Sequence, residues 1–268
     1  MTPTYAFAYL LAFALSLAFP AAAAAHPLGL RPHTFNGSGM PVTKGGVTAF
    51  TIRNHECSSV DYGDGRGEND CHNGNVRSNL SPHTARPGQG WSYSFEIRVP
   101  VPIAYPGFHN DWSIGYLTGA HDSRLRIASW EGNLLHNFIY MLKVDATRAV
   151  TFLDKVCVPP GALGAWHRFR LDVVWENDPG GRIEVSCDGK VLYAASGIAT
   201  AENPHCYVTN ECEPGVEKRP SQILAILGPV MQGFGPEWQR YGKPSQFTEF
   251  GGPVTVEFRN VDFRRLKK

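Results

Sequence analysis

The sequence has almost no excess of either charge. Its 25 Lys and Arg residues are balanced by 24 Asp and Glu residues over 268 positions, a net charge of +1. This balance gives no electrostatic field that would attract nucleic acid or an anionic membrane, so neither is expected as a partner. The 43% hydrophobic and 12% aromatic content is sufficient for a sizeable core.

Long hydrophobic runs are absent beyond the first 25 residues. Residues 10–20 form an apolar run, and residues 21–25 add the small side chains that signal peptidase accepts, although the segment lacks an initial charged residue. We predict a signal peptide over residues 1–25. No later run approaches the roughly 20 apolar residues of a membrane span. The mature protein, residues 26–268, is expected to be a secreted, extracellular monomer.

Closely spaced cysteine pairs, typical of zinc sites, are also absent. The six cysteines are an even number and fit an oxidising environment, so three disulfides are predicted, with zinc as the alternative for some of them. Sequence alone allows 15 pairings. Loop length favours pairing the first two and the last two, which leaves Cys157 with Cys187. The six residues are Cys57, Cys71, Cys157, Cys187, Cys206 and Cys212.

Alternation of apolar and polar residues recurs along the chain and predicts strands. It is clear in residues 91–99, 169–175, 182–187 and 254–263, and Asp188-Gly189 reads as a tight hairpin turn. Residues 132–144 are ambiguous between helix and strand, and residues 138–144 fit better as a strand. With 28 Gly and 20 Pro, turns are frequent. The prediction is a single all-β domain, a two-sheet antiparallel β-sandwich of the jelly-roll type.

The stretch "GNVRSNLS", residues 74–81, carries unusual polar residues for a strand. With a period of two, Val76 and Leu80 would enter the core, while Arg77 and Asn79 would point to the other face. One interpretation is a groove that holds an anionic ligand. The other is an ordinary solvated face or a structural hydrogen-bonding pair, as is common on antiparallel sheets.

Several longer runs resemble one enzyme family. These are "NDCHNGNVRSNLSPHTARPGQGWSYSFEIRVP", "GAWHRFRLDVVWENDPGGRIEVSCDGKVLY", "ILAILGPVMQ" and "VEFRNVDFRRL". Together, over roughly residues 69–266, they are similar to the jelly-roll polysaccharide lyases, the relatives of heparin lyase I, glucuronan lyase and alginate lyase with a concanavalin A-like fold. The resemblance implies a lyase that cleaves an acidic, uronate-containing polysaccharide by β-elimination.

That reaction requires a group that neutralises the uronate carboxylate, a base for the C5 proton, and an acid for the departing oxygen. Arg77 can hold a carboxylate through two hydrogen bonds, and Asn79 can donate another. The resemblance places Tyr116 and His121 where the family has a Gln and His strand. His72 is a second candidate base.

The sequence departs from the family pattern in "ILAILGPVMQ". Val230 stands where the resemblance implies the catalytic Tyr, and Ile226 stands at the Lys position, while Gly228 and the candidate substrate-binding residue Gln232 are retained. Asn79 replaces the family's usual Glu. Another tyrosine could supply the acid, and the candidates are Tyr140, Tyr207 and Tyr241.

Two sequons, at Asn36 and Asn79, predict N-glycosylation. A glycan on Asn79 would block the proposed groove, so the two expectations for this residue conflict.

Other classes of protein stay open. A non-catalytic, lectin-like carbohydrate-binding protein would keep the fold without an acid or a base, as Val230 indicates. Cleavage after residue 25 would expose His26 as an N-terminal copper ligand. A glycoside hydrolase is disfavoured because no strand carries closely spaced carboxylates. No cofactor or metal is otherwise expected, although the acidic residues 61–70 could bind calcium.

Overall fold

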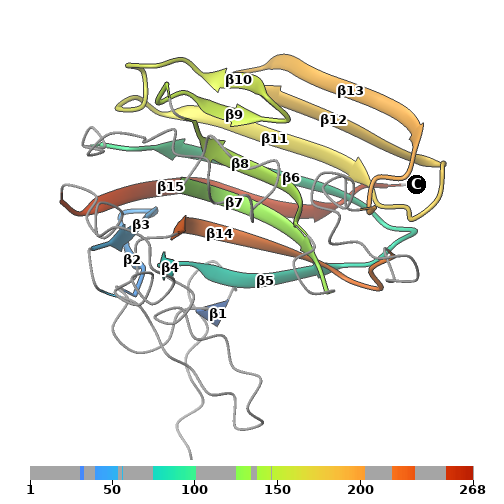
Figure 1. Cartoon of the computed structure of the whole chain (residues 1–268), viewed down its shortest axis with the longest axis horizontal. Helices are drawn as coiled ribbons and strands as arrows, with labels where there is room; N and C mark the ends of the chain where they lie inside the picture. Colours follow the sequence, from blue (N-terminus) through green and yellow to red (C-terminus); the bar gives the residue numbers. More distant parts are fainter. Residues whose placement is uncertain are drawn as a thin grey trace, which may run out of the picture.

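Two antiparallel sheets form the protein in the computed structural model (Figure 1). The structure describes residues 31–32, 40–53, 56, 75–100, 125–133, 138–145, 147–202, 219–232 and 252–267. Within these ranges there are strands and no helices, so no described segment is a helix that could span a membrane. The prediction of an all-β, two-sheet sandwich is confirmed.

The larger sheet has eight strands in the order β1-β5-β14-β7-β8-β9-β10, with β4 also paired to β14. The strand bounds are β1 Arg31–Pro32, β4 Asn75–Arg77, β5 Leu80–Ala85, β7 Leu125–Gly132, β8 Phe138–Val144, β9 Val150–Phe152, β10 Lys155–Val158 and β14 Ile223–Gln232.

The smaller sheet has seven strands in the order β13-β12-β11-β6-β15-β3-β2. The bounds are β2 Val42–Lys44, β3 Val47–Ile52, β6 Gly90–Arg98, β11 His167–Val174, β12 Gly181–Cys187, β13 Lys190–Ile198 and β15 Val254–Arg265. All the strands expected from alternation are present, including β8, whose sequence was ambiguous.

The core lies between the sheets and is rich in aromatic residues. Tyr93, Phe95 and Phe169 come from the smaller sheet, and Trp130 and Phe152 come from the larger one; all five are nearly inaccessible to solvent. Phe95 stacks on Phe169, whose ring lies 5.5 Å from that of Phe152 in the facing sheet. This packing fixes which face of each sheet points inward.

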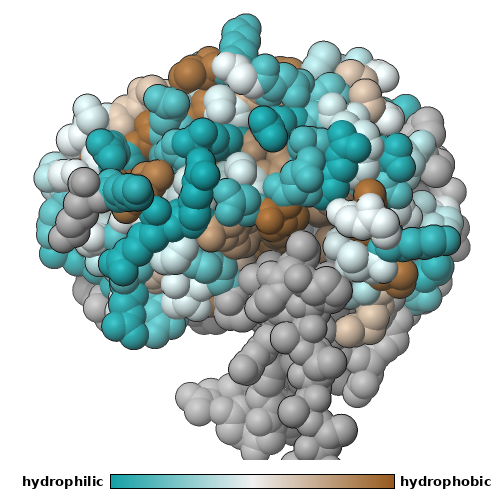
Figure 2. Space-filling view, turned by 180° about the vertical axis from the view of Figure 1, so that it is seen from behind, coloured by the Kyte–Doolittle hydropathy of each residue, from teal (hydrophilic) through white to brown (hydrophobic). Residues whose placement is uncertain are grey.

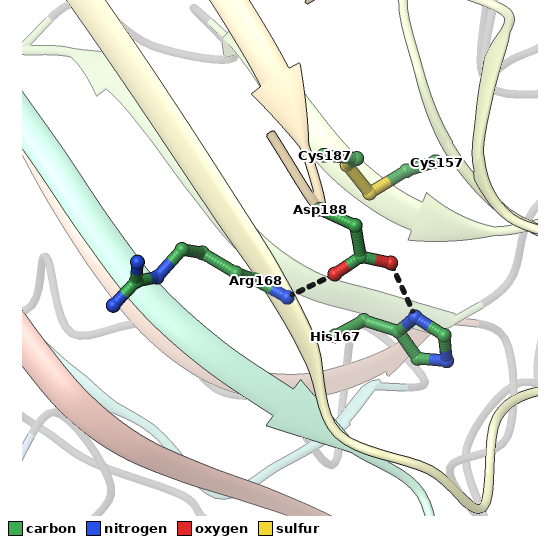
Figure 3. Close-up of a disulfide and its surroundings, with 5 residues drawn as sticks. All are labelled: Cys157, His167, Arg168, Cys187 and Asp188. Atoms are coloured by element: carbon green, nitrogen blue, oxygen red, sulfur yellow. Dashed lines mark hydrogen bonds and ion pairs between the residues drawn. A yellow bond between two sulfur atoms is a disulfide. The ribbon is translucent and has the colours of Figure 1, made fainter. Parts of the chain in front are cut away.

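The β12–β13 hairpin turns at Asp188-Gly189, as predicted. Both residues have positive φ, 48° and 79°, which a two-residue hairpin turn of type I′ requires. Next to this turn, Cys187 of β12 forms a disulfide with Cys157 of β10, with 5.4 Å between their Cα atoms (Figure 3). This bond links one sheet to the other and confirms the predicted pairing. The other four cysteines lie outside the described residues.

The stretch "GNVRSNLS" is not one continuous strand. Its strand character is interrupted at Ser78 and Asn79, between β4 and β5. The interruption lies beside Gly228 and Pro229 of β14, where β14 shifts register against β7, and the Ser78 N–H donates to the Pro229 carbonyl at 3.1 Å. The prediction of one continuous strand is therefore wrong at Ser78 and Asn79, while Val76 and Leu80 enter the core as predicted.

Gly228 is essential to this close approach. Its φ is +116°, and a Cβ at this position would lie 2.3 Å from the Ser78 carbonyl oxygen and 2.8 Å from the Asn79 Cα. Only glycine tolerates both this conformation and this contact.

Candidate functional site

A row of directly opposed residues crosses the outer face of the larger sheet. On β14, Val230 lies between Arg77 of β4 and Arg126 of β7. Lys143 of β8 lies opposite Arg126, and Thr151 of β9 lies opposite Lys143. Since side chains alternate along a strand, these residues face away from the core to which their sequence neighbours belong. Those neighbours are Val76, Met231, Leu125, Leu142, Val144, Val150 and Phe152. We call the five opposed residues the cationic row.

The cations of this row are buried although they lie outside the core. Arg77 is 6% exposed, Arg126 7% and Lys143 9%. Charged side chains are rarely buried to this extent unless they are paired or serve a ligand. The burial therefore marks this face as different from an ordinary solvated face.

Carboxylates lie close to two cations of the row. The Arg126 Nη1 lies 3.0 Å from the Glu131 Oε1, which also accepts a hydrogen bond from the Ser129 hydroxyl at 2.6 Å. The Lys143 Nζ lies 3.8 Å from the Asp154 Oδ1, and the Asp154 side chain is 93% exposed. Arg126 is thus paired at hydrogen-bonding distance, whereas the contact of Lys143 is long and reaches an exposed carboxylate.

The structure places Arg77 on the outer face, as predicted. Asn79 is not beside it on a continuous strand: it lies in the β4–β5 interruption, 1% exposed, against Gly228. A side chain buried in this way is not presented for a glycan, so the described fold argues against the predicted glycosylation of Asn79.

The positions that depart from the family pattern occupy the expected strand. Val230 and Ile226 are buried on β14 but do not belong to the core cluster. Their side chains cannot transfer a proton. Gln232 ends β14 opposite Asn75, and its side chain lies outside the description.

Tyr140 is wrong as a substitute acid. It belongs to the core, where its ring stacks on Phe152 at 5.6 Å and lies 5.9 Å from that of Trp175. Burial raises the pKa of its hydroxyl well above the ordinary value, and the side chain points away from the cationic row. The other predicted site residues lie outside the described residues: Asn36, His72, Tyr116, His121, Tyr207 and Tyr241.

Sequence reasoning missed Arg126 and Lys143. Each is the single cation within an apolar strand, in "LRIASWEG" and "FIYMLKV". A single charged residue in an otherwise apolar strand, at a position that alternates with the core residues, is a signal that sequence analysis can use. Their position opposite each other depends on the register between the strands, which the sequence does not reveal.

The described residues contain no group of three or more His, Cys, Asp or Glu side chains that could hold a metal ion. Residues 61–70, considered for calcium, and His26, considered for copper, fall outside the described ranges.

Comparison with known proteins gives one family match. A family model described as polysaccharide lyase matches residues 32–208, which is more than half of the chain. No curated protein matches the sequence.

Similar solved structures include the endo-β-1,4-glucuronan lyase from the fungus Trichoderma reesei, with 15% identity, a TM-score of 0.45 and coverage of 83% of this chain and 82% of that chain. Alginate lyase Aly36B has 12% identity, a TM-score of 0.43 and 85% coverage of both chains. The alginate lyase AlyA1 from Zobellia galactanivorans has 9% identity, a TM-score of 0.45 and coverage of 87% and 83%.

Proposed function

The chain belongs to the polysaccharide lyase family, and on this premise we propose that it cleaves an acidic, uronate-containing polysaccharide by β-elimination. The observation that carries the choice of an acidic substrate is the cationic row. Its three buried cations face outward from the larger sheet, and two of them, Arg126 and Lys143, lie directly opposite each other. The carboxylate of a uronate can form charge-assisted hydrogen bonds with such cations, whereas a neutral sugar cannot.

In the proposed reaction, Arg77 holds the carboxylate of the reacting uronate. Neutralising this charge makes the C5 proton more acidic. A base removes that proton, the released electron pair forms the C4–C5 double bond, and the bond from C4 to the glycosidic oxygen breaks. An acid then protonates the departing oxygen. The products are a new chain end and an unsaturated uronate.

The base and the acid are proposed from the family resemblance. His121, His72 and Tyr116 have side chains that can move protons in this way, and we propose Gln232 as a further contact to the substrate; Asn79, buried against Gly228, is not proposed as one. We also propose that the enzyme acts outside the cell, which the apolar first 25 residues and the Cys157–Cys187 disulfide support. We propose that it acts as a monomer.

The test is incubation with glucuronan, alginate, heparin and pectate while the ultraviolet absorbance of the unsaturated uronate is followed. The Arg77→Ala variant should lose about a hundredfold in kcat/KM, equivalent to about 2.7 kcal/mol. Arg77→Lys should recover only part of this loss, since an ammonium group lacks the planar fork of a guanidinium.

The matched control is Arg170→Ala on the outer face of the smaller sheet, where the same type of side chain forms an exposed ion pair with Asp172. It should keep wild-type activity. Because Arg77 is buried, melting temperatures are measured on all variants. A well-folded Arg77→Ala protein with unchanged kinetics would remove this residue from the site.

A second candidate function is carbohydrate binding without catalysis. The observation that favours it is Val230, an aliphatic residue between Arg77 and Arg126 at the position where the resemblance implies a tyrosine acid. Binding of an acidic oligosaccharide without new absorbance on any of the four polymers would select this function.

A further inference from the structure

The far end of the cationic row, at Lys143 and Thr151, has the properties of a separate binding site. We propose that these two residues form a second carboxylate subsite, which binds an acidic sugar beyond the one held by Arg77. This inference rests on the proposed function, because it assigns a further part of the same substrate to the same face.

The Thr151 hydroxyl is the first observation. Thr151 is 4% exposed, and its Oγ1 is fully buried with no hydrogen-bond partner in the described part of the chain. A buried hydroxyl without a partner is destabilising, and native proteins rarely retain one without a reason. A ligand oxygen at this position would satisfy it.

The Lys143 ammonium group is the second observation. The register places it directly opposite Thr151, on the same face. Its ion pair with Asp154 is long, at 3.8 Å, and the partner is almost fully exposed to water. Arg126, by contrast, approaches Glu131 at hydrogen-bonding distance. Lys143 is therefore held less closely by its carboxylate than Arg126 is, and it lies beside a hydroxyl that can donate to the same anion.

The spacing between strands gives the relation between the two subsites. From β4 to β8 there are three steps between neighbouring strands, which corresponds to roughly 14 Å between Arg77 and Lys143 at their backbones. That distance is longer than a disaccharide. A single polysaccharide chain that crosses the strands would reach both cations only with three or more sugar residues.

The test compares kinetics on uronate oligosaccharides of two and six residues. Lys143→Gln should raise KM for the hexasaccharide about tenfold, the effect of losing one charge-assisted contact, with kcat unchanged and little effect on the disaccharide. Thr151→Val should raise the KM for the hexasaccharide severalfold. Its melting temperature should equal or exceed that of the wild type, because an unsatisfied hydroxyl is removed. Lys190→Gln, at the exposed start of β13, removes the same charge elsewhere and should change nothing.

The outcomes separate this inference from the proposed function. An active enzyme whose Lys143→Gln and Thr151→Val variants both keep the wild-type KM would overturn the subsite and leave the lyase function intact. If no polymer is cleaved, calorimetric titration with the hexasaccharide replaces kinetics. A tenfold weakening by Lys143→Gln would then support the subsite on a binding protein, and unchanged affinity would overturn it. If Lys143→Gln folds poorly, the Thr151→Val result decides.

Discussion

The outer faces of the two sheets carry similar residue types in opposite arrangements. On the smaller sheet, charges of opposite sign face each other on neighbouring strands: Arg98 pairs with Glu257, and the Arg259 Nε lies 2.6 Å from the Glu96 Oε2. On the larger sheet, Arg126 faces Lys143, a residue of the same sign. Figure 2 shows the molecule from behind the view of Figure 1, and the coloured residues on that face are mostly hydrophilic.

The pKa shifts reflect the compensation on the smaller sheet. Hydrogen bonds from Asn260 and Arg259 lower the pKa of Glu96. Burial alone would raise the pKa of Asp172, but hydrogen bonds from Arg170 and Ser92 outweigh it and the pKa is lowered. Charges of opposite sign thus face each other across neighbouring strands of the smaller sheet, whereas two cations do so on the larger sheet. The outer faces of the two sheets therefore differ in how charged residues pair across neighbouring strands, and not in the types of residue they contain.

The largest expected effect is the loss of stability caused by Gly228→Ala in the larger sheet. The added Cβ would collide with the backbone of Ser78 and Asn79, so we expect a loss of about 4 kcal/mol in the free energy of unfolding, from overpacking together with strain at positive φ. Chemical denaturation measures it. Gly88→Ala is the control, because Gly88 also has a positive φ of 83° but nothing lies within 4 Å of its Cβ position. Equal losses in the two variants would disprove the collision.

The next effect concerns the bond that joins the two sheets. Replacing both Cys157 and Cys187 with alanine should lower the free energy of unfolding by about 3 kcal/mol, because the cross-link restricts the unfolded chain. Thermal unfolding of the double variant measures this loss. A melting temperature equal to that of the wild type would show that packing between the sheets suffices.

Acid should affect the smaller sheet through its carboxylates. Burial alone would raise the pKa of Asp188, but hydrogen bonds from His167 and the Arg168 N–H hold it below the ordinary value (Figure 3). A carboxylate with a lowered pKa contributes stability above its unfolded pKa of about 4, and this contribution is lost as pH falls through the folded value. Melting temperature should therefore decline below about pH 4. Asp172→Asn and Asp188→Asn should each flatten the decline, and an unchanged profile would contradict this assignment.

The smallest effect is expected from an ion pair on the smaller sheet. Arg170 and Asp172 form an exposed pair at 2.6 Å, and such pairs contribute about 0.5 kcal/mol. Arg170→Ala should change the free energy of unfolding by no more than this. If Arg170→Ala lowered the free energy of unfolding as much as Arg77→Ala does in the same measurement, the distinction between the two faces would be contradicted.

Much of the fold follows from local patterns in the sequence. Strict alternation predicts β6, β11, β12 and β15, and the Asp188-Gly189 pair predicts the hairpin. The interruption at Ser78 could not be predicted, since it lies beside a register shift on β14, far away in sequence. Of the three candidate tyrosine acids, Tyr140 can be excluded from the sequence alone, because it alternates in step with Leu142 and Val144, which lie in the core.

Sequence analysis could predict a residue of the candidate site only where that residue was unusual within its own segment. Arg77 stood out within its own segment and lies on the expected face. Arg126 and Lys143 acquire their importance from being opposite each other, and Thr151 from the loss of a hydrogen bond on burial. These are properties of the assembled sheet, which no local pattern contains.

The edge strand β13 has a consequence for how copies of the protein meet in solution. A long, exposed edge is a template on which another chain can add a strand, the first step of many aggregates. Here the pairing with β12 shifts register twice, and Gly197 adopts a φ of 70° near the end of the strand. These irregularities bend the row of outward hydrogen-bonding groups, so a straight strand from a second copy cannot match it along its length. We therefore expect the geometry of β13 to oppose edge-to-edge fibril growth in concentrated protein.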